Sequence, residues 1–266
     1  YAAMVDKKTC AIFSLEMPAI QLCKRMMVSE TGLSADKIKG GVRLEPYEWV
    51  QLEQKLKDLS RAPLYIDDTP SLPVMEFRSK AKRLVNQKGI KLIIVDYLQL
   101  MQGPSELKGL REQEVAAISR TLKATAKELN VPIIALSQLN RTAVNRQNSN
   151  GRPLLSDLRE SGSIEQDADM VLFIHRPDYQ NLSPDPSEAG KAQLIIAKHR
   201  NGEIGDINLM FRSSEVKFVD AEDTLLARAA MDDIGQGYVP VSDMSAAVGD
   251  IPAGGSSDFG PNNDFA

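Results

Sequence analysis

Hydrophobic and polar residues follow two different rhythms along the chain, and together they predict an alternating α/β protein. Short apolar runs rich in β-branched and aliphatic residues predict strands at residues 10–15, 64–66, 92–95, 133–136, 171–174, 194–197 and 207–211. Between several of these runs, apolar residues recur every three or four positions, which predicts amphipathic helices. Strands that alternate with helices are typical of a mainly parallel sheet with helices on its faces.

Four segments carry the helical pattern. One runs from Ser71, the expected N-cap, to Gly89, the expected stop. A second covers residues 112–130 and ends before Pro132, and residues 18–30 and 45–60 predict two more. The run at 92–95 is apolar throughout, which predicts a central strand covered on both faces.

Two polar stretches depart from this pattern. Residues 140–153 are rich in Asn and Arg and have no periodicity, which predicts a surface loop. Residues 245–266 contain four Gly, two Pro, three Asp and no Lys or Arg, which predicts a disordered acidic tail. We therefore expect a domain at residues 1–220, an extension at 221–244 and a tail at 245–266.

Composition and charge narrow the function classes. Of the 266 residues, 42% are hydrophobic and 26% charged, which excludes a wholly disordered, collagen-like or coiled-coil chain. The net charge of −4 means that any nucleic-acid site must be a local patch. The only two cysteines, Cys10 and Cys23, are too few for a disulfide framework, so we expect reduced thiols in a cytoplasmic protein. No apolar run approaches the ~18 residues that span a bilayer, so no membrane partner is expected.

Polar side chains follow three of the predicted strands. Asp96 comes directly after Leu92–Val95, Glu16 follows the first strand just before Pro18, and Gln138 follows the strand at 133–136. Ligands of open α/β sheets bind at the carboxyl ends of strands. There, an Asp can orient Mg²⁺ through its water shell, a Glu can activate water, and an amide can sense a phosphate.

Each of these three residues also has a purely structural explanation. Asp96 can simply form a turn, Glu16 can complement a helix dipole, and Gln138 can be a buried amide with satisfied hydrogen bonds. Three polar strand ends together are harder to explain in this way than any one alone.

A local positive patch follows the third strand end. The stretch from Leu139 to Arg159 contains a single acidic residue, Asp157, and four arginines: Arg141, Arg146, Arg152 and Arg159. The stretch has no aromatic residue, so we expect contacts with the backbone of single-stranded nucleic acid rather than base stacking. The alternative is a solvated loop without a ligand.

A predicted hairpin carries two cations. Lys198 and Arg200 lie two positions apart, on one face of a strand, just before an Asn201-Gly202 turn. Such a pair can reach the phosphates of a neighbouring subunit as an arginine finger, or it can be a solubilising surface feature. His175 and His199 have no partners at metal-ligand spacing.

These segments together resemble the motor domain of bacterial replicative DNA helicases of the DnaB type, which are RecA-fold ATPases. Residues 13–17 resemble the catalytic-glutamate motif, 94–101 the Walker B motif and 137–141 the motif that senses the phosphate. Residues 156–169 resemble the DNA-loop motif, and 198–202 the finger that acts on the next subunit. The resemblance covers residues 1–220 with the motifs in the family's order.

The resemblance implies a homo-hexamer that uses ATP and Mg²⁺ to move 5′→3′ along single-stranded DNA and unwind duplex, with a primase and a helicase loader as partners. It implies that Glu16 polarises the attacking water, Asp96 holds Mg²⁺, and Gln138 reports the phosphate. It assigns Arg159, Glu160 and Gly162 to the DNA loop. It assigns Lys198 and Arg200 to the neighbour's ATP site.

One family motif is missing. No segment matches the P-loop pattern G-x-x-x-x-G-K-[ST], and the first residue is Tyr1, so we expect a fragment that lacks the phosphate cradle and the P-loop strand. Two alternatives stay open. One is another RecA-fold ATPase, such as a phage-type helicase or a recombination ATPase. The other is a ring subunit that binds DNA without catalysis.

Overall fold

A computed structural model describes residues 1–139, 151–178 and 189–221, and only the backbone of residues 159–161. Residues 1–221 form one compact unit. The expected extension and acidic tail lie outside the described residues from position 222 on, as do Arg141 and Arg146. No helix in the described ranges combines the length and the hydrophobicity needed to cross a membrane.

The first part of the chain builds a parallel sheet. Its strands are β1 (Cys10–Ser14), β2 (Leu64–Asp67), β3 (Leu92–Asp96) and β4 (Ile133–Ala135), in the order β2-β1-β3-β4. The register pairs Ser14 of β1 with Asp96 of β3, and Val95 of β3 with Ala135 of β4. All three strands that carry the predicted site residues are therefore neighbours, with their carboxyl ends at one edge.

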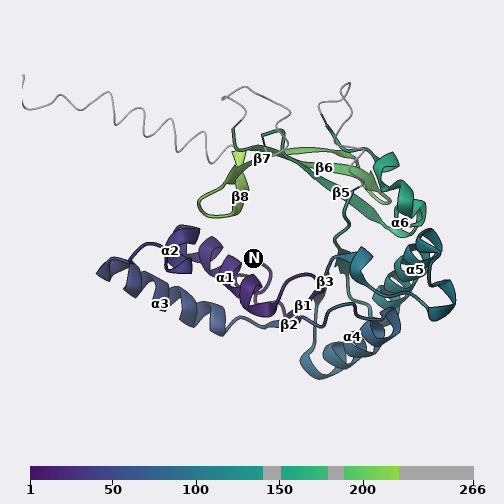
Figure 1. Cartoon of the computed structure of the whole chain (residues 1–266), viewed down its shortest axis with the longest axis horizontal. Helices are drawn as coiled ribbons and strands as arrows, with labels where there is room; N and C mark the ends of the chain where they lie inside the picture. The colour runs from purple at the N-terminus through teal and green to yellow at the C-terminus, as the bar shows by residue number, and fades with distance from the viewer. Residues whose placement is uncertain (140–150, 179–188, 222–266) are drawn as a thin grey trace, which may run out of the picture. The chain divides into compact units, whose positions relative to one another are not determined.

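Helices follow the strands, as the periodicity predicts. The longer ones are α1 (Ala19–Thr31), α3 (Pro46–Ser60), α4 (Val74–Lys88) and α5 (Arg111–Leu129), and a short helix, α2 (Ala35–Lys39), was not predicted. The prediction that Ser71 caps α4 is wrong, because Ser71 has a φ of 51° and Pro73 is the N-cap. Figure 1 shows α4 beside α5, and Glu128 of α5 joins them through ion pairs with Arg78 and Lys82.

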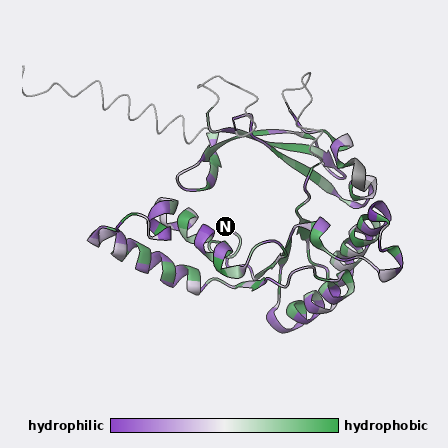
Figure 2. Cartoon of the chain, viewed as in Figure 1, coloured by the Kyte–Doolittle hydropathy of each residue, from purple (hydrophilic) through white to green (hydrophobic). Residues whose placement is uncertain are grey.

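The core of this part lies between the sheet and the helices α4 and α5. Phe13, Phe77, Ile93 and Val95 have no exposed surface, and the rings of Phe13 and Phe77 meet edge to face at 4.7 Å between centroids. Figure 2 shows mostly hydrophobic strands beside helices of mixed character. The expectation that residues 92–95 are fully covered on both faces is only half right, because alternate residues of β3 are partly exposed.

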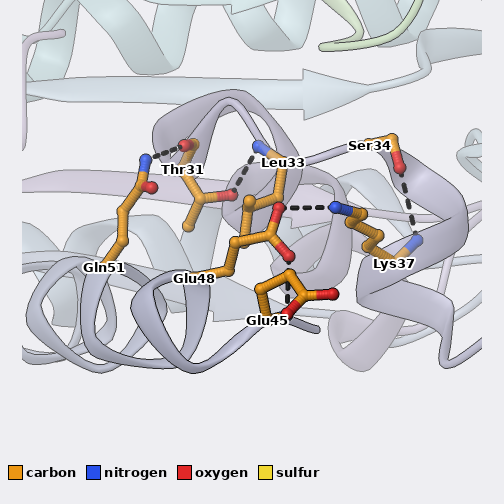
Figure 3. Close-up of polar contacts among 7 residues, drawn as sticks. All are labelled: Thr31, Leu33, Ser34, Lys37, Glu45, Glu48 and Gln51. Carbon is orange, nitrogen blue, oxygen red and sulfur yellow. Dashed lines mark hydrogen bonds and ion pairs between the residues drawn. The ribbon is translucent and has the colours of Figure 1, made fainter. Parts of the chain in front are cut away.

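A network of polar contacts joins α1, α2 and α3 (Figure 3). Glu48 of α3 is buried, and its carboxylate accepts hydrogen bonds from the Lys37 ammonium at 2.5 Å and the Glu45 backbone N–H at 2.9 Å. Gln51 donates to the carbonyl of Thr31 at 2.7 Å, at the end of α1. The hydrogen bond from Lys37, and then that from the Glu45 N–H, lower the pKa of Glu48.

The second part of the chain forms an antiparallel sheet. Its strands are β5 (Met170–His175), β6 (Lys191–His199), β7 (Gly205–Arg212) and β8 (Lys217–Asp220), in sequence order. β6 and β7 form the predicted hairpin, whereas β8 was not predicted. A small core of Leu158, Val171, Phe173 and Ile195 supports it.

Strands β4 and β5 each have only one neighbour in the described sheets. Both carry exposed apolar side chains: Ile134 on β4, and Met170, Leu172 and Ile174 on β5. Each of these two edge strands of the described sheets therefore has exposed apolar side chains next to its unpaired backbone edge.

Between the two sheets in sequence come two short helical segments, η5 (Leu155–Ser161) and α6 (Gly162–Asp167). Leu154 N–H donates to the carboxylate of Asp157 at 2.7 Å, which fixes the start of η5. Ser119 of α5 donates to the carboxylate of Asp167 at 2.7 Å, which fixes α6 against α5.

Candidate nucleotide and DNA site

The parallel register brings two of the predicted residues to the same edge of the sheet. Asp96 is the last residue of β3, and Glu16 lies two positions beyond the end of β1. The backbone N–H of Leu15, next to Glu16, donates to the carbonyl of Asp96 at 2.7 Å. Glu16 is exposed and Asp96 partly buried, so both carboxylates are open to a ligand that arrives from solvent.

The local sequence explains why the chain turns after β1. The Ser14 hydroxyl donates to the Met17 carbonyl at 2.7 Å, which closes a tight turn around Glu16. Pro18 then starts α1, whose first N–H, on Ala19, is satisfied by the Asp68 carboxylate at 2.9 Å. The turn leaves the Glu16 side chain outside the strand and outside the helix.

Gln138 follows β4 at the same edge. Its side chain is exposed, so the alternative of a buried amide is wrong. Its backbone is held by Gln99, which lies just after β3 in η1 (Leu98–Leu100). The Gln99 amide nitrogen donates to the Ser137 hydroxyl at 2.8 Å and to the Gln138 carbonyl at 3.1 Å, and its amide oxygen accepts from the Gln138 N–H at 3.2 Å.

Sequence reasoning missed Gln99 as a site residue. It lies inside the run Leu98-Gln99-Leu100, where a polar residue between two leucines is a weak signal taken alone. Its partners are 38 and 39 positions away, so only the fold shows that it fixes the turn that carries Gln138.

The donor set suits a magnesium ion that keeps most of its own water. In the part of the chain that the structure describes, no three His, Cys, Asp or Glu side chains gather into a metal cluster. Mg²⁺ prefers hard oxygen ligands and is often bound through one or two carboxylates plus substrate phosphates. Asp96 and Glu16 supply oxygen atoms of this kind, so the residues present fit the ion.

The residues of the predicted DNA loop fall on η5 and α6. Arg159 and Glu160 belong to η5, and Gly162 begins α6 with open space where a side chain would be. Arg152 is described but is not free, because its guanidinium pairs with both carboxylate oxygens of Asp206 at 2.7 Å. It also donates to Gln193 at 3.2 Å, so it links strands β6 and β7 of the second sheet.

The two cations of the hairpin both contact the segment around α6. The Lys198 ammonium donates to the Glu165 carbonyl at 2.5 Å. Arg200 lies just past β6, and its guanidinium pairs with Asp169 at 3.1 Å. Arg200 is about half exposed, with 53% of its side-chain surface open.

The strand order β2-β1-β3-β4 and the polar residues at the ends of β1, β3 and β4 define a RecA-like α/β domain with a site at its carboxyl edge. The chain belongs to the family described as the DnaB-like helicase C terminal domain, whose model matches residues 1–220.

Similar proteins agree with this assignment. The replicative DNA helicase DnaB of Geobacillus stearothermophilus is 49% identical over 220 residues, which are 83% of this chain and 47% of that protein. The replicative DNA helicase DnaC of Bacillus subtilis is 46% identical over 215 residues, or 81% of this chain and 46% of that protein. The chain thus spans about half the length of these relatives.

Two solved structures share the fold. The ATPase domain of G40P is 35% identical with a TM-score of 0.73, covering 81% of this chain and 75% of its own. A DnaB-like replicative helicase, described with its interactions with primase, is 34% identical with a TM-score of 0.73, covering 81% of this chain and 51% of its own.

Proposed function

We propose that this chain is the motor part of a replicative DNA helicase, in which ATP hydrolysis drives 5′→3′ movement along single-stranded DNA. The observation that carries the proposal is the parallel register. It supports a shared site because Glu16, Asp96 and Gln138 follow three adjacent strands that end at the same edge. Open α/β sheets bind their ligands at this edge.

In this proposal each residue at the edge has a separate task. Asp96 orients the waters of Mg²⁺, which supplies charge stabilisation to the phosphates when bound. The Glu16 carboxylate accepts a hydrogen bond from the attacking water and makes it a better nucleophile. Gln138 contacts the γ-phosphate through its amide, which can donate and accept.

The phosphate cradle has to come from a segment outside these 266 residues, because the sequence has no P-loop match. We therefore expect the chain by itself to hydrolyse ATP negligibly. Functional tests therefore use a chimeric subunit in which the segment of the Geobacillus relative that precedes the matched region is joined before residue 1.

DNA contacts are assigned to η5 and the start of α6. Arg159 is the candidate phosphate ligand, with Glu160 and Gly162 beside it on the loop. Arg141 and Arg146 are further candidates from the arginine-rich stretch. Arg152 is a weaker one, because its ion pair with Asp206 would have to break first.

Lys198 and Arg200 are assigned to the ATP site of the next subunit in a homo-hexameric ring. The hairpin supports this role because Arg200 is at the tip of β6 and half exposed. A primase and a helicase loader are the further partners we propose, the first by analogy with the helicase described with primase. We place the protein in the cytoplasm, where Cys10 and Cys23 stay reduced.

The test of the proposal compares single substitutions with mixed rings. Glu16→Gln should reduce DNA-stimulated ATP hydrolysis by about 100-fold or more and leave ring assembly intact, since a general base contributes about 10²–10⁴-fold. Asp96→Asn should also reduce hydrolysis strongly with assembly intact, because it weakens the hold on the Mg²⁺ that stabilises the phosphate charge. Arg200→Ala should do the same, because a finger contributes on the order of 10³-fold or more.

Rings mixed from two variants then show whether Arg200 acts on the ATP site of the neighbouring subunit or on that of its own subunit. Rings that combine Arg200→Ala subunits with Glu16→Ala subunits should regain hydrolysis, because some interfaces then hold an intact Glu16 and an intact Arg200. Mixed rings that form but stay inactive at every ratio would show that Arg200 does not act across the interface.

A further inference from the structure

The strongest unexplained feature beside the proposed site is Asp169, a carboxylate that pairs with two cations and attracts a third at longer range. Asp169 lies between α6 and β5, two residues after Asp167. Its carboxylate accepts a hydrogen bond from the Lys123 ammonium of α5 and pairs with Arg200 at 3.1 Å. Lys127, one turn further along α5, adds a longer-range attraction.

Asp169 holds Arg200 at two points. Besides the ion pair of the side chains, the backbone N–H of Arg200 donates to the backbone carbonyl of Asp169 at 2.8 Å. The backbone hydrogen bond fixes the position of the Arg200 backbone, and the ion pair draws the guanidinium toward Asp169. An exposed ion pair on an unrestrained backbone would restrict a long side chain less.

Asp169 itself is fixed by the helix behind it. Lys123 holds its carboxylate, and Ser119, one turn earlier on α5, holds Asp167. The hydrogen bond from Lys123 keeps the pKa of Asp169 below its usual value, with Arg200 adding to the effect, so the group stays charged at neutral pH. A charged carboxylate that α5 holds in place can therefore orient the Arg200 guanidinium.

The geometry leaves part of the guanidinium for another ligand. Asp169 engages one terminal nitrogen of Arg200, and a guanidinium presents five N–H donors in a rigid fork. The remaining donors can therefore bind an anion while the ion pair with Asp169 persists. With the side chain half exposed, that anion can belong to another subunit.

We infer that Asp169 is a positioning residue, which directs the Arg200 guanidinium toward the phosphates in the neighbouring subunit. The inference rests on the proposed role of Arg200 as a finger. Asp169 touches no substrate in this scheme and acts only through Arg200. Its loss should therefore lower the rate of the chemical step and leave nucleotide and DNA binding unchanged.

The first measurement compares Asp169→Asn with the parent in complete rings. The substitution keeps the shape and removes the charge. We expect kcat for DNA-stimulated hydrolysis to fall about tenfold, a small part of the 10³-fold or more that a finger supplies. KM for ATP, affinity for single-stranded DNA and ring assembly should stay within twofold. An unchanged or increased kcat would overturn the inference.

A matched control comes from the same helix. Glu128 of α5 is likewise a carboxylate between two cations, but among the described residues its ion pairs are with Arg78 and Lys82 of α4 rather than with the hairpin. Glu128→Gln should leave kcat unchanged. If it lowers kcat as much as Asp169→Asn does, the effect of Asp169 comes from stability and the inference fails.

Asp169→Asn in rings that also carry a substitution at Arg200 separates a failure of this inference from a failure of the proposed function. In Arg200→Gln rings, which lack the cation that Asp169 holds, Asp169→Asn should lower kcat by less than twofold. A further tenfold loss there would mean that Asp169 acts elsewhere. If Arg200→Ala by itself leaves hydrolysis intact, the proposed function of Arg200 fails, whatever Asp169→Asn does.

If Asp169→Asn rings do not assemble, Lys123→Met provides a second test of the positioning role of Asp169. It removes the ammonium that fixes Asp169 and leaves the ion pair with Arg200 possible. We expect kcat to fall two- to threefold in the parent and to stay unchanged in Arg200→Gln rings. No fall in the parent would overturn the inference.

Discussion

Substitution of Gln99 tests whether the turn that carries Gln138 has to be held in place. Gln99 makes three hydrogen bonds to Ser137 and Gln138, between 2.8 and 3.2 Å long. Because Gln138 is exposed, each bond belongs at the low end of the usual range, about 0.5 kcal/mol. Three of them contribute about 1.5 kcal/mol, which corresponds to about tenfold in rate if all of it positions Gln138 in the transition state.

We therefore expect Gln99→Ala to lower kcat for DNA-stimulated ATP hydrolysis by up to about tenfold. Gln99→Glu keeps the oxygen that accepts from the Gln138 N–H and loses both donor bonds, so about fivefold is expected. Steady-state hydrolysis by complete rings measures both. Gln102→Ala is the control, because the Gln102 backbone pairs with Leu72 and Val74 while its side chain is exposed. If Gln99→Ala has no more effect than the control, Gln99 does not position the sensor.

Three further predictions concern other parts of the chain. Arg159→Ala should weaken binding of single-stranded DNA of any sequence and reduce the log–log salt slope by roughly one unit, as fluorescence titrations at several salt concentrations would show. Phe77→Ala should destabilise the domain by about 3–5 kcal/mol, because the ring is fully buried, and pulse proteolysis in urea would detect a lower midpoint. The lowered pKa of Glu48 predicts stability that is present above pH 4.5 and lost as the pH falls through the folded-state pKa, and Glu48→Gln should flatten this dependence of the urea midpoint.

Local sequence pattern was enough for the elements that bury an apolar face. The strand that contains Ile93 and Val95 and the helix that carries Ile118 and Leu122 are predictable within one or two residues, because burial imposes periods of two and 3.6. The five-residue α2 and the exposed β8 lack such a face and were missed. Residue type favours Ser71 as a helix cap, but Pro73 occupies that position in the structure.

The candidate site was predictable where it depends on strand ends. Asp96 stands out because a charged residue directly follows four apolar ones, and Glu16 stands out in the same way. The contacts of Gln99 with Ser137, and of Asp169 with Lys123 and Arg200, were not predictable. These contacts join segments more than 30 positions apart, and the periodicity of apolar residues does not indicate which distant polar side chains contact each other.

The free edges of β4 and β5 have a practical consequence for work with this chain. Within the described residues, each presents N–H and C=O groups that no neighbouring strand pairs, beside exposed apolar residues such as Ile134 on β4 and Leu172 on β5. Two copies that meet at such edges can pair their backbones and cover these side chains at once, which is a common route to aggregation. Expression of residues 1–266 by themselves is therefore expected to yield oligomers and inclusion bodies, and a lysine at position 134 or 172 should improve the soluble yield.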